Sequence, residues 1–422
     1  MVRVQLGQTR SSSARKHAAI VAICVALVLA AWRDAVARKW VEEDFWPREV
    51  KTYTFVPPGK PGPQSNEDTV IGEVLEYRPD KGDTFFDLAR YFGLGYNELV
   101  DANPGVDEWI PGHFDKPVIV PQEFVLPNGT YEGIVVNVPE MRLYYYPPSK
   151  GGARTVVTFP VGLGREEWKT PTGKFSVREK TVNPTWNIPE SIRKERIADK
   201  GFSETMIPGG DPRNPLGKYR MRLTLDLYGI HGTNIPWGVG MLVSHGCVRL
   251  YPEDIEQLYP MVPLGMTGVF VYQPIKVGMR DGRVFVEVHK DLYGMKPGMY
   301  RETRSMLEQH GFMSIVDEEK LRAAVLAQTG MPVDVTRGSS SSDGYAPAPS
   351  MRPAATEVHE AAPPAPDDAG EPLRPASGTV GRGVTASAPA ARPSADRMTT
   401  EVLVPSRATV DAARQPLSSD AR

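Results

Sequence analysis

The spacing at which apolar residues recur changes along the chain, and these changes indicate where its domains begin and end. Between residues 74 and 121 a short apolar strand, Val74–Tyr77, precedes four apolar residues at helical spacing. These four are Phe85, Leu88, Ala89 and Phe92. Asp83 or Thr84 can cap that helix, a second helical stretch follows, and Ile119 lies in a returning strand. The pattern predicts a compact β-α-α-β unit.

From residue 129 to 273 the apolar residues follow the two-residue period of β-strands. Ile134–Val138 and Met141–Tyr146 are separated by two residues and predict a hairpin. Further strands are expected at Thr155–Gly162, Gly173–Glu179, Met221–Leu227 and Gly268–Tyr272. One helix is marked by a proline in its first turn, Pro252. We therefore expect a mostly β domain with few helices.

Three other segments have their own composition. Residues 183–215 are rich in Pro, Gly and charge, which predicts a long loop of the kind that often forms a lid. Residues 274–336 predict a small α/β extension, with a strand at Arg283–His289 and a helix at Lys320–Gln328. Residues 337–422 are rich in Ser, Pro and Ala, and we expect a disordered tail because they cannot bury enough apolar surface to offset the entropy of ordering.

The N-terminus has the layout of a secretory signal peptide. A positively charged region precedes the apolar run Ala18–Trp32, and Ala35-Val36-Ala37 offers a cleavage site, so residues 1–37 are the predicted signal. An uncleaved membrane anchor is the alternative. Either interpretation places the body of the protein outside the cytoplasm. Residues 38–73, rich in Pro and charge, predict a linker.

Composition excludes some classes of partner. The chain has 422 residues and a net charge of −2, so it has no basic excess with which to bind nucleic acid. Contact with a membrane is expected only through an uncleaved N-terminal segment. Of the two cysteines, Cys24 lies inside the predicted signal. After cleavage Cys247 is the only thiol, and an intrachain disulfide cannot form.

Cys247 stands among residues that suit nucleophilic catalysis. A thiol with an ordinary pKa of about 8.5 is mostly protonated at neutral pH, so a nucleophilic cysteine needs a base. His245 lies two residues away and would leave an extended segment on the same face. His231 is far enough along the chain to lie on an adjacent strand. The sequence leaves both histidines as candidates for the base.

The neighbours of the cysteine add two features. Gly246 permits an unusual backbone angle and a close approach of substrate. Arg249 alternates with Cys247 and can receive a substrate carboxylate through two hydrogen bonds. Two other interpretations stay open. His231, His245 and Cys247 could hold zinc, although a fourth ligand and a C-x-x-C spacing are missing. The thiol could also be a buried structural residue.

Two parts of the chain resemble known families. Residues 74–121 resemble the glycan-binding LysM module, through Gly82-Asp83-Thr84 and Ala102-Asn103-Pro104. His231-Gly232-Thr233 followed by Ser244-His245-Gly246-Cys247-Val248-Arg249-Leu250 resembles the signature of the YkuD-type L,D-transpeptidases. The likeness extends to segments 140–144, 170–173 and 214–217. The whole is similar to the Gram-negative branch that anchors the outer-membrane (Braun) lipoprotein to peptidoglycan.

This resemblance implies a β-sandwich catalytic domain that works in the periplasm with neither cofactor nor metal. Cys247 would attack the bond after diaminopimelate in a peptidoglycan tetrapeptide stem and release D-alanine. His231 would be the base, its ring held by the carbonyl of Gly232. The C-terminal lysine of an outer-membrane lipoprotein would accept the acyl group. Alternative acceptors are a second diaminopimelate and water. A different class, a non-catalytic wall-binding protein, stays open.

The resemblance also assigns residues around the nucleophile. Ser244, His245 and Gly246 would shape the active-site turn, and backbone N–H groups at Gly246 and Cys247 would bind the oxyanion. Arg249 would help to position the substrate. Members of this family are typically acylated by carbapenems.

Overall fold

The computed structural model describes residues 50–80, 82–113, 116–149, 154–200, 204–339 and 346–347. The predicted signal, residues 1–37, lies outside these ranges, as does the predicted tail except for residues 337–339 and 346–347. Within the described ranges, no helix has the length and apolar character needed to cross a membrane.

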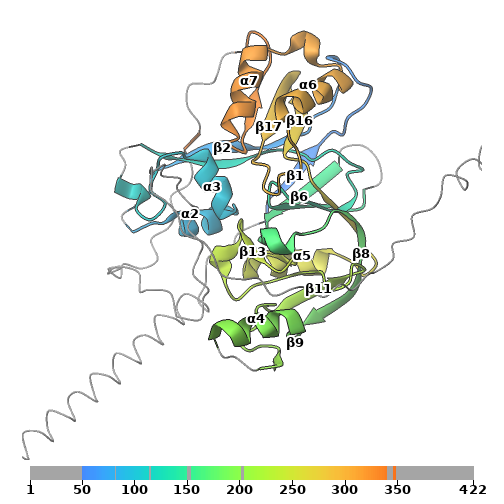
Figure 1. Ribbon diagram of the computed structural model, residues 1–422. Helices are drawn as coiled ribbons and strands as arrows, with labels where there is room; N and C mark the ends of the chain where they lie inside the picture. The colour runs from blue at the N-terminus through green and yellow to red at the C-terminus, as the bar shows by residue number, and fades with distance from the viewer. Residues whose placement is uncertain are drawn as a thin grey trace, which may run out of the picture. The chain divides into compact units, whose positions relative to one another are not determined.

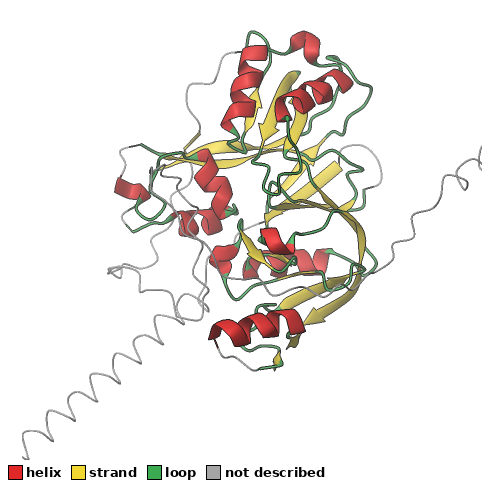
Figure 2. Ribbon diagram, viewed as in Figure 1, coloured by secondary structure: helices red, strands yellow, loops and turns green. Residues whose placement is uncertain are grey.

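The predicted mostly β domain is confirmed and is built on one mixed sheet of nine strands (Figure 2). In spatial order the strands are β1 (Thr52–Phe55), β6 (Arg154–Pro160), β5 (Arg142–Tyr146), β4 (Gly133–Asn137), β15 (Thr267–Val271), β8 (Gly173–Val182), β11 (Tyr219–Leu223), β12 (Gly229–His231) and β14 (Val248–Arg249). β4 and β5 form the predicted hairpin. β7 (Leu163–Gly164) and β13 (Leu242–Ser244) make a separate parallel pair. The predicted helix after the cysteine is α5 (Pro252–Met261).

The two halves of the nine-stranded sheet face each other across a single core. Val136 and Leu143 from one half share this core with Met221, Ile230 and Val248 from the other. The domain therefore has the two facing layers of a sandwich, while β8 and β15 keep both layers in one continuous hydrogen-bonded sheet. Side chains alternate across a strand. The residues that precede and follow Met221, Ile230 and Val248 in the sequence therefore point away from this core, to the opposite face of the sheet.

Two predictions about irregular segments are wrong. The expected loop at 183–215 contains helix α4 (Glu190–Lys200), flanked by the short paired strands β9 (Trp186–Asn187) and β10 (Met206–Ile207). The charged sequence of α4 carries few apolar residues, so no helical period shows. The expected linker at 38–73 contains β1, whose Phe55 is buried in the interior.

The β-α-α-β unit is confirmed as β2 (Val70–Tyr77), α2 (Phe85–Phe92), α3 (Tyr96–Ala102) and β3 (Val118–Val125). Thr84 caps α2, because its side chain accepts from the Asp87 N–H while the Asp87 carboxylate accepts from the Thr84 N–H. β19 (Ala346–Pro347) pairs in parallel with β2. The expectation of disorder therefore fails for these two residues of the tail.

The C-terminal extension is an α/β unit, as predicted. β16 (Ile275–Arg280), β17 (Arg283–Val288) and β18 (Pro332–Asp334) form its sheet. Helices α6 (Met299–Gln309) and α7 (Glu318–Ala327) pack beside β16 and β17 (Figure 1). The strand and the helix expected from the sequence correspond to β17 and α7, whereas the sequence does not predict β16, β18 or α6. Four 3₁₀ turns complete the described elements: η1 (Pro111–His113), η2 (Glu166–Trp168), η3 (Pro236–Gly238) and η4 (Met313–Ile315).

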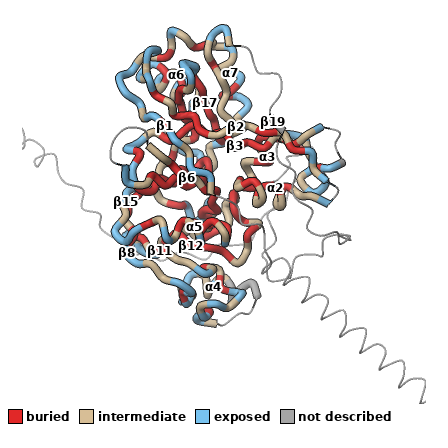
Figure 3. Tube along the Cα trace, turned by 180° about the vertical axis from the view of Figure 1, so that it is seen from behind, coloured by how far each residue is buried: buried red, intermediate tan, exposed pale blue. Residues whose placement is uncertain are grey.

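The β-α-α-β unit is fixed to the mostly β domain by buried contacts. The Arg142 guanidinium, on β5, donates to both carboxylate oxygens of Glu98 on α3, at 2.7 and 2.8 Å. At the start of α3, the N–H groups of Tyr96 and Asn97 donate to the carbonyls of Val239 and Gly240. Figure 3 shows buried positions along β2 and β3, whereas α4 is largely exposed or half-buried.

Candidate active site

Cys247 lies on a tight turn between β13 and β14 that the Ser244 side chain closes. Ser244 Oγ donates to the Cys247 carbonyl at 2.7 Å and accepts from the Gly246 N–H at 3.0 Å. Gly246 has a φ of +107°, and a Cβ there would lie 2.6 Å from the Tyr228 ring. The turn therefore requires glycine at this position.

The same turn leaves one backbone donor beside the thiol. The Gly246 N–H is engaged by Ser244, so it does not point freely toward a substrate. The Cys247 N–H forms no hydrogen bond with any part of the chain that the structure describes. The donor pair expected at Gly246 and Cys247 thus reduces to the single N–H of Cys247.

Two residues outside the sequence motif support this turn. Thr170 Oγ1 donates to the Gly246 carbonyl at 3.0 Å and accepts from the Gly164 N–H at 3.0 Å. Tyr293, from the C-terminal extension, donates through its hydroxyl to the Gly164 carbonyl at 2.8 Å. The Tyr293 hydroxyl also accepts from the Thr170 N–H at 3.2 Å. No sequence pattern points to Tyr293, because this residue lies far along the chain from the motif.

His231 stands on β12, directly beside the strand that follows Cys247. Its Nδ1 lies 2.7 Å from the Gly232 carbonyl, and because a carbonyl only accepts, Nδ1 carries the proton. Burial, with the nearby Arg249 guanidinium second, lowers the pKa of His231 to about 3. The imidazole is therefore neutral near pH 7, with Nε2 free to accept a proton.

Strand register brings His231 close to the segment that carries Cys247. β12 and β14 run parallel, with His231 opposite Arg249, and Cys247 lies two residues before Arg249. The Gly229 N–H, two residues before His231, hydrogen-bonds the thiol. Burial raises the pKa of the partly exposed Cys247 thiol, while that hydrogen bond and two arginines oppose the rise. The resting thiol donates to the Leu227 carbonyl at 3.5 Å.

His245 is engaged elsewhere. Its Nε2 lies 2.8 Å from Glu195 on α4 and 3.0 Å from Arg165, and these two partners pair with each other at 3.0 Å. The Trp168 ring lies 5.3 Å from the imidazole, centroid to centroid. The hydrogen bond from His245 lowers the pKa of Glu195. His245 thus joins the turn that carries Cys247 to α4, and Arg165 and Glu195 flank the candidate site without having been identified from the sequence.

The donor atoms that could share a metal ion do not belong to the cysteine motif. Within the described ranges, the one such group is Glu140, Glu287 and His289, with ligand atoms inside 4.8 Å of one another. Lys276 Nζ lies 2.7 Å from a carboxylate oxygen of each glutamate, so an ammonium already takes the place of a cation. The proposed zinc set of His231, His245 and Cys247 is not brought together in this way.

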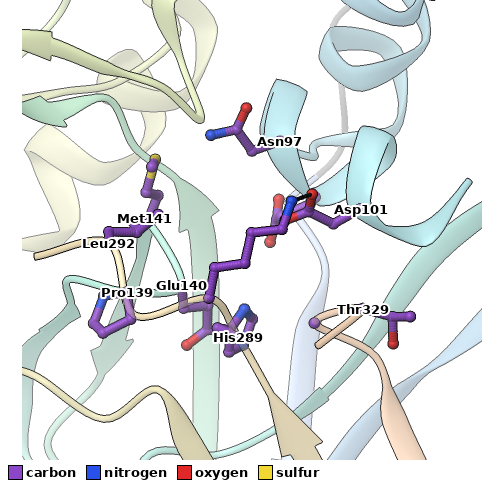
Figure 4. A pocket seen from close by; sticks show the side chains of 11 residues that line it. Asn97, Asp101, Pro139, Glu140, Met141, His289, Leu292 and Thr329 are labelled. Carbon is purple, nitrogen blue, oxygen red and sulfur yellow. Dashed lines mark hydrogen bonds and ion pairs between the residues drawn. The ribbon is translucent and has the colours of Figure 1, made fainter. Parts of the chain in front are cut away.

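This charged cluster borders a pocket that does not include Cys247. Figure 4 shows Glu140 and His289 on one side of it and Asn97 and Asp101, from α3, on the other. Lys290 Nζ bonds the Asp101 carboxylate across it at 2.6 Å. Because the parts of the fold meet here through ion pairs, the pocket marks a structural junction.

Comparison with known proteins gives consistent matches. The family model of the YkuD L,D-transpeptidase catalytic domain matches residues 131–277. The probable L,D-transpeptidase ErfK/SrfK of Escherichia coli is 36% identical over 261 residues, which cover 60% of this chain and 82% of that protein. The probable L,D-transpeptidase YbiS of Escherichia coli is 37% identical over 255 residues, covering 58% and 81% of the two chains. A solved L,D-transpeptidase from Mycobacterium tuberculosis, at 20% identity and a TM-score of 0.23, covers 39% of this chain and 63% of that one.

Proposed function

The chain belongs to the YkuD family of L,D-transpeptidases, and from that premise we propose that Cys247 and His231 carry its reaction. The protein is a peptidoglycan L,D-transpeptidase, an enzyme that acts on peptidoglycan stem peptides. The observation that supports the assignment of residues is the neutral, oriented imidazole of His231 on the strand next to the nucleophile.

Acylation follows from these groups. His231 Nε2 takes the thiol proton as the sulfur attacks the carbonyl of the diaminopimelate–D-alanine bond. The Cys247 N–H stabilises the developing oxyanion. His231 then passes the proton to the departing amine, the C–N bond breaks, and a thioester forms with release of D-alanine. Ser244, His245 and Gly246 hold the turn that aims the sulfur, and Arg249 positions the donor.

Deacylation repeats the proton transfers with an incoming amine. The amine attacks the thioester, its proton passes to the sulfur through His231, and an amide replaces the thioester. We propose the C-terminal lysine of an outer-membrane lipoprotein as the acceptor, with the periplasm as the site of action. A second diaminopimelate or water would use the same residues and give a cross-link or an L,D-carboxypeptidase.

The β-α-α-β unit is proposed to bind the glycan strand as a LysM-like module. Its exposed side carries Trp109, which is 54% exposed and lies against Phe86. Phe86 in turn stacks on Tyr96 with ring centroids 4.4 Å apart. Aromatic side chains exposed in this way offer apolar faces to sugar rings.

The test of the chemistry uses tetrapeptide muropeptides and mass spectrometry. Wild-type protein should form a covalent acyl-enzyme and release D-alanine, while Cys247→Ala does neither. A peptide ending in the lipoprotein lysine, offered beside a diaminopimelate acceptor, then identifies the preferred amine. Folded wild-type protein with a free thiol that yields no adduct would leave only the non-catalytic wall-binding interpretation.

A further inference from the structure

Three side chains form a row across three neighbouring strands beside the nucleophile. In the register of β11, β12 and β14, Arg220 is the partner of His231, and His231 is the partner of Arg249. The side chains of partners on adjacent strands point to the same face of the sheet and are neighbours there. A guanidinium group therefore stands on each side of the imidazole.

Arg220 also lies close to the thiol. Its Nε is 3.7 Å from the position that a Cβ on Gly229 would take, and the Gly229 N–H contacts the Cys247 sulfur. Arg220 and Arg249 both act electrostatically on that thiol. The two arginines thus flank the place where the scissile bond must lie during attack.

Neither flanking arginine forms an ion pair with the residues that the structure describes. Nε of Arg220 and Nε of Arg249 are buried without a hydrogen-bond partner among the same described residues. Two residues further along β11, Arg222 does pair, with Glu179 at 3.2 Å. Both side chains are half-buried, and a buried Nε without a hydrogen-bond partner is costly, so we read this pair of cations as a site for an anionic ligand.

The reaction restricts which anion that ligand is. His231 must deliver its proton to the departing amine, so the nitrogen of that amine must lie within hydrogen-bond distance of His231 Nε2. In D-alanine the carboxylate is attached to the carbon bonded to this nitrogen. The carboxylate must therefore come to rest beside His231 in the row, within reach of a guanidinium that can bind it with two hydrogen bonds.

We propose that Arg220, together with Arg249, forms the binding subsite for the free carboxylate of the departing D-alanine. This inference rests on the proposed function and makes Arg220 a specificity-determining residue for it. The ligand class is a stem peptide whose last residue ends in an unmodified α-carboxylate. A donor with a neutral C-terminus leaves both guanidinium groups unpaired, and the enzyme discriminates against it.

The test compares two donors in single-turnover acylation of the full chain. One is a tetrapeptide stem ending in D-alanine, and the other is the same stem ending in D-alaninamide. We expect the kcat/KM of the wild type to be about ten- to hundredfold higher for the donor that ends in D-alanine than for the donor that ends in D-alaninamide. One charge-assisted hydrogen bond supplies a difference in this range. Arg220→Gln should lose this preference by slowing the first donor alone. Arg222→Gln, the matched control, should keep it.

The outcomes separate the two hypotheses. If the wild type releases neither D-alanine nor D-alaninamide, the proposed function itself fails. If it releases both at equal rates, the activity stands and the carboxylate subsite is refuted. If Arg220→Gln slows both donors equally and slows alkylation by iodoacetamide to the same degree, Arg220 acts only on thiol acidity, and the proposal is overturned.

Discussion

At the scale of single residues, the site depends on two positions: Gly246, where a larger side chain has no room, and His231, whose surroundings disfavour the charged imidazole. Gly246 combines a left-handed φ with a close contact to Tyr228, so the direction of Cys247 is set by the absence of a side chain one residue earlier. Burial and the neighbouring arginines lower the pKa of His231, so its imidazole is neutral near pH 7. Both effects are local and can be changed one residue at a time.

Replacing Gly246 by alanine should reduce the acylation rate at least tenfold without unfolding the protein. A Cβ at this position requires an unfavourable φ and would press on the Tyr228 ring, which displaces the turn. Gly282→Ala is the matched control, because Gly282 has a φ of +72° and nothing within 4 Å of its Cβ position. Acylation is measured by mass spectrometry and folding by thermal melting. Equal rates for both variants would contradict this role.

The depressed pKa of His231 should make stability depend on pH. Between its folded pKa of about 3 and the ordinary value of 6.5, the unfolded chain binds a proton that the folded chain does not. The free energy of unfolding therefore falls as pH decreases through this window, by at most about 1.4 kcal/mol per pH unit for this group. Urea titrations from pH 7 to pH 4 measure the slope. A His231→Gln variant that shows the same slope as wild type would assign it to other groups.

At the scale of elements, the turn carrying Cys247 is supported by Thr170 of the catalytic domain, by Tyr293 of the C-terminal extension and by the β-α-α-β unit. The β-α-α-β unit packs its Gly95 against Gly240, and a Cβ on Gly240 would lie 2.3 Å from the Gly95 Cα. Gly240 lies just before β13 and so leads into the turn that carries Cys247. The packing of α3 on the catalytic domain and the position of the thiol are thus coupled through a few residues of chain.

Gly240→Ala should therefore destabilise the protein and slow acylation together. The added Cβ meets backbone atoms that cannot move aside without separating α3 from the catalytic domain. Gly265→Ala is the control, since Gly265 has a comparable φ of +82° and nothing within 4 Å. The free energy of unfolding and the acylation rate are both measured. Loss of stability in both variants by the same amount would show that backbone angle alone is responsible.

The elements also show how far sequence patterns reach. The β4–β5 hairpin, α2 and α5 were predicted because strong periodicity and capping residues mark them. α4 was missed because its mean composition is polar, and β1 because four residues surrounded by proline and charge give no period. The row of Arg220, His231 and Arg249 depends on strand register between distant segments, which one sequence cannot supply.

At the scale of the whole molecule, one buried charge cluster joins all three folded parts. Lys276, on β16, lies between Glu140 of the catalytic hairpin and Glu287 of β17. Glu287 also accepts from the Val125 N–H of the β-α-α-β unit at 2.6 Å. Burial alone would raise the pKa of Glu140, but Lys276 and His289 hold it below its ordinary value. The parts should therefore unfold together.

Lys276→Met should cost about 3–5 kcal/mol, because it leaves two buried carboxylates without their cation. Lys290→Met is the control, since Lys290 is 56% exposed in its pair with Asp101 and should contribute about 1 kcal/mol or less. Denaturant unfolding followed by fluorescence and by circular dichroism measures both. Separate transitions in the wild-type protein would contradict unfolding as one unit.

The first residues of α3 determine whether the β-α-α-β unit can be separated from the rest of the protein. Small domains appended to an enzyme are often regarded as portable units that can be moved between proteins. Here the N–H groups of Tyr96 and Asn97 find their acceptors on Val239 and Gly240, outside the unit. Glu98 likewise makes its ion pair with Arg142 of the catalytic sheet. Excised, the unit would lose both sets of contacts, so transferring it to another enzyme would require partners for α3 to be supplied there as well.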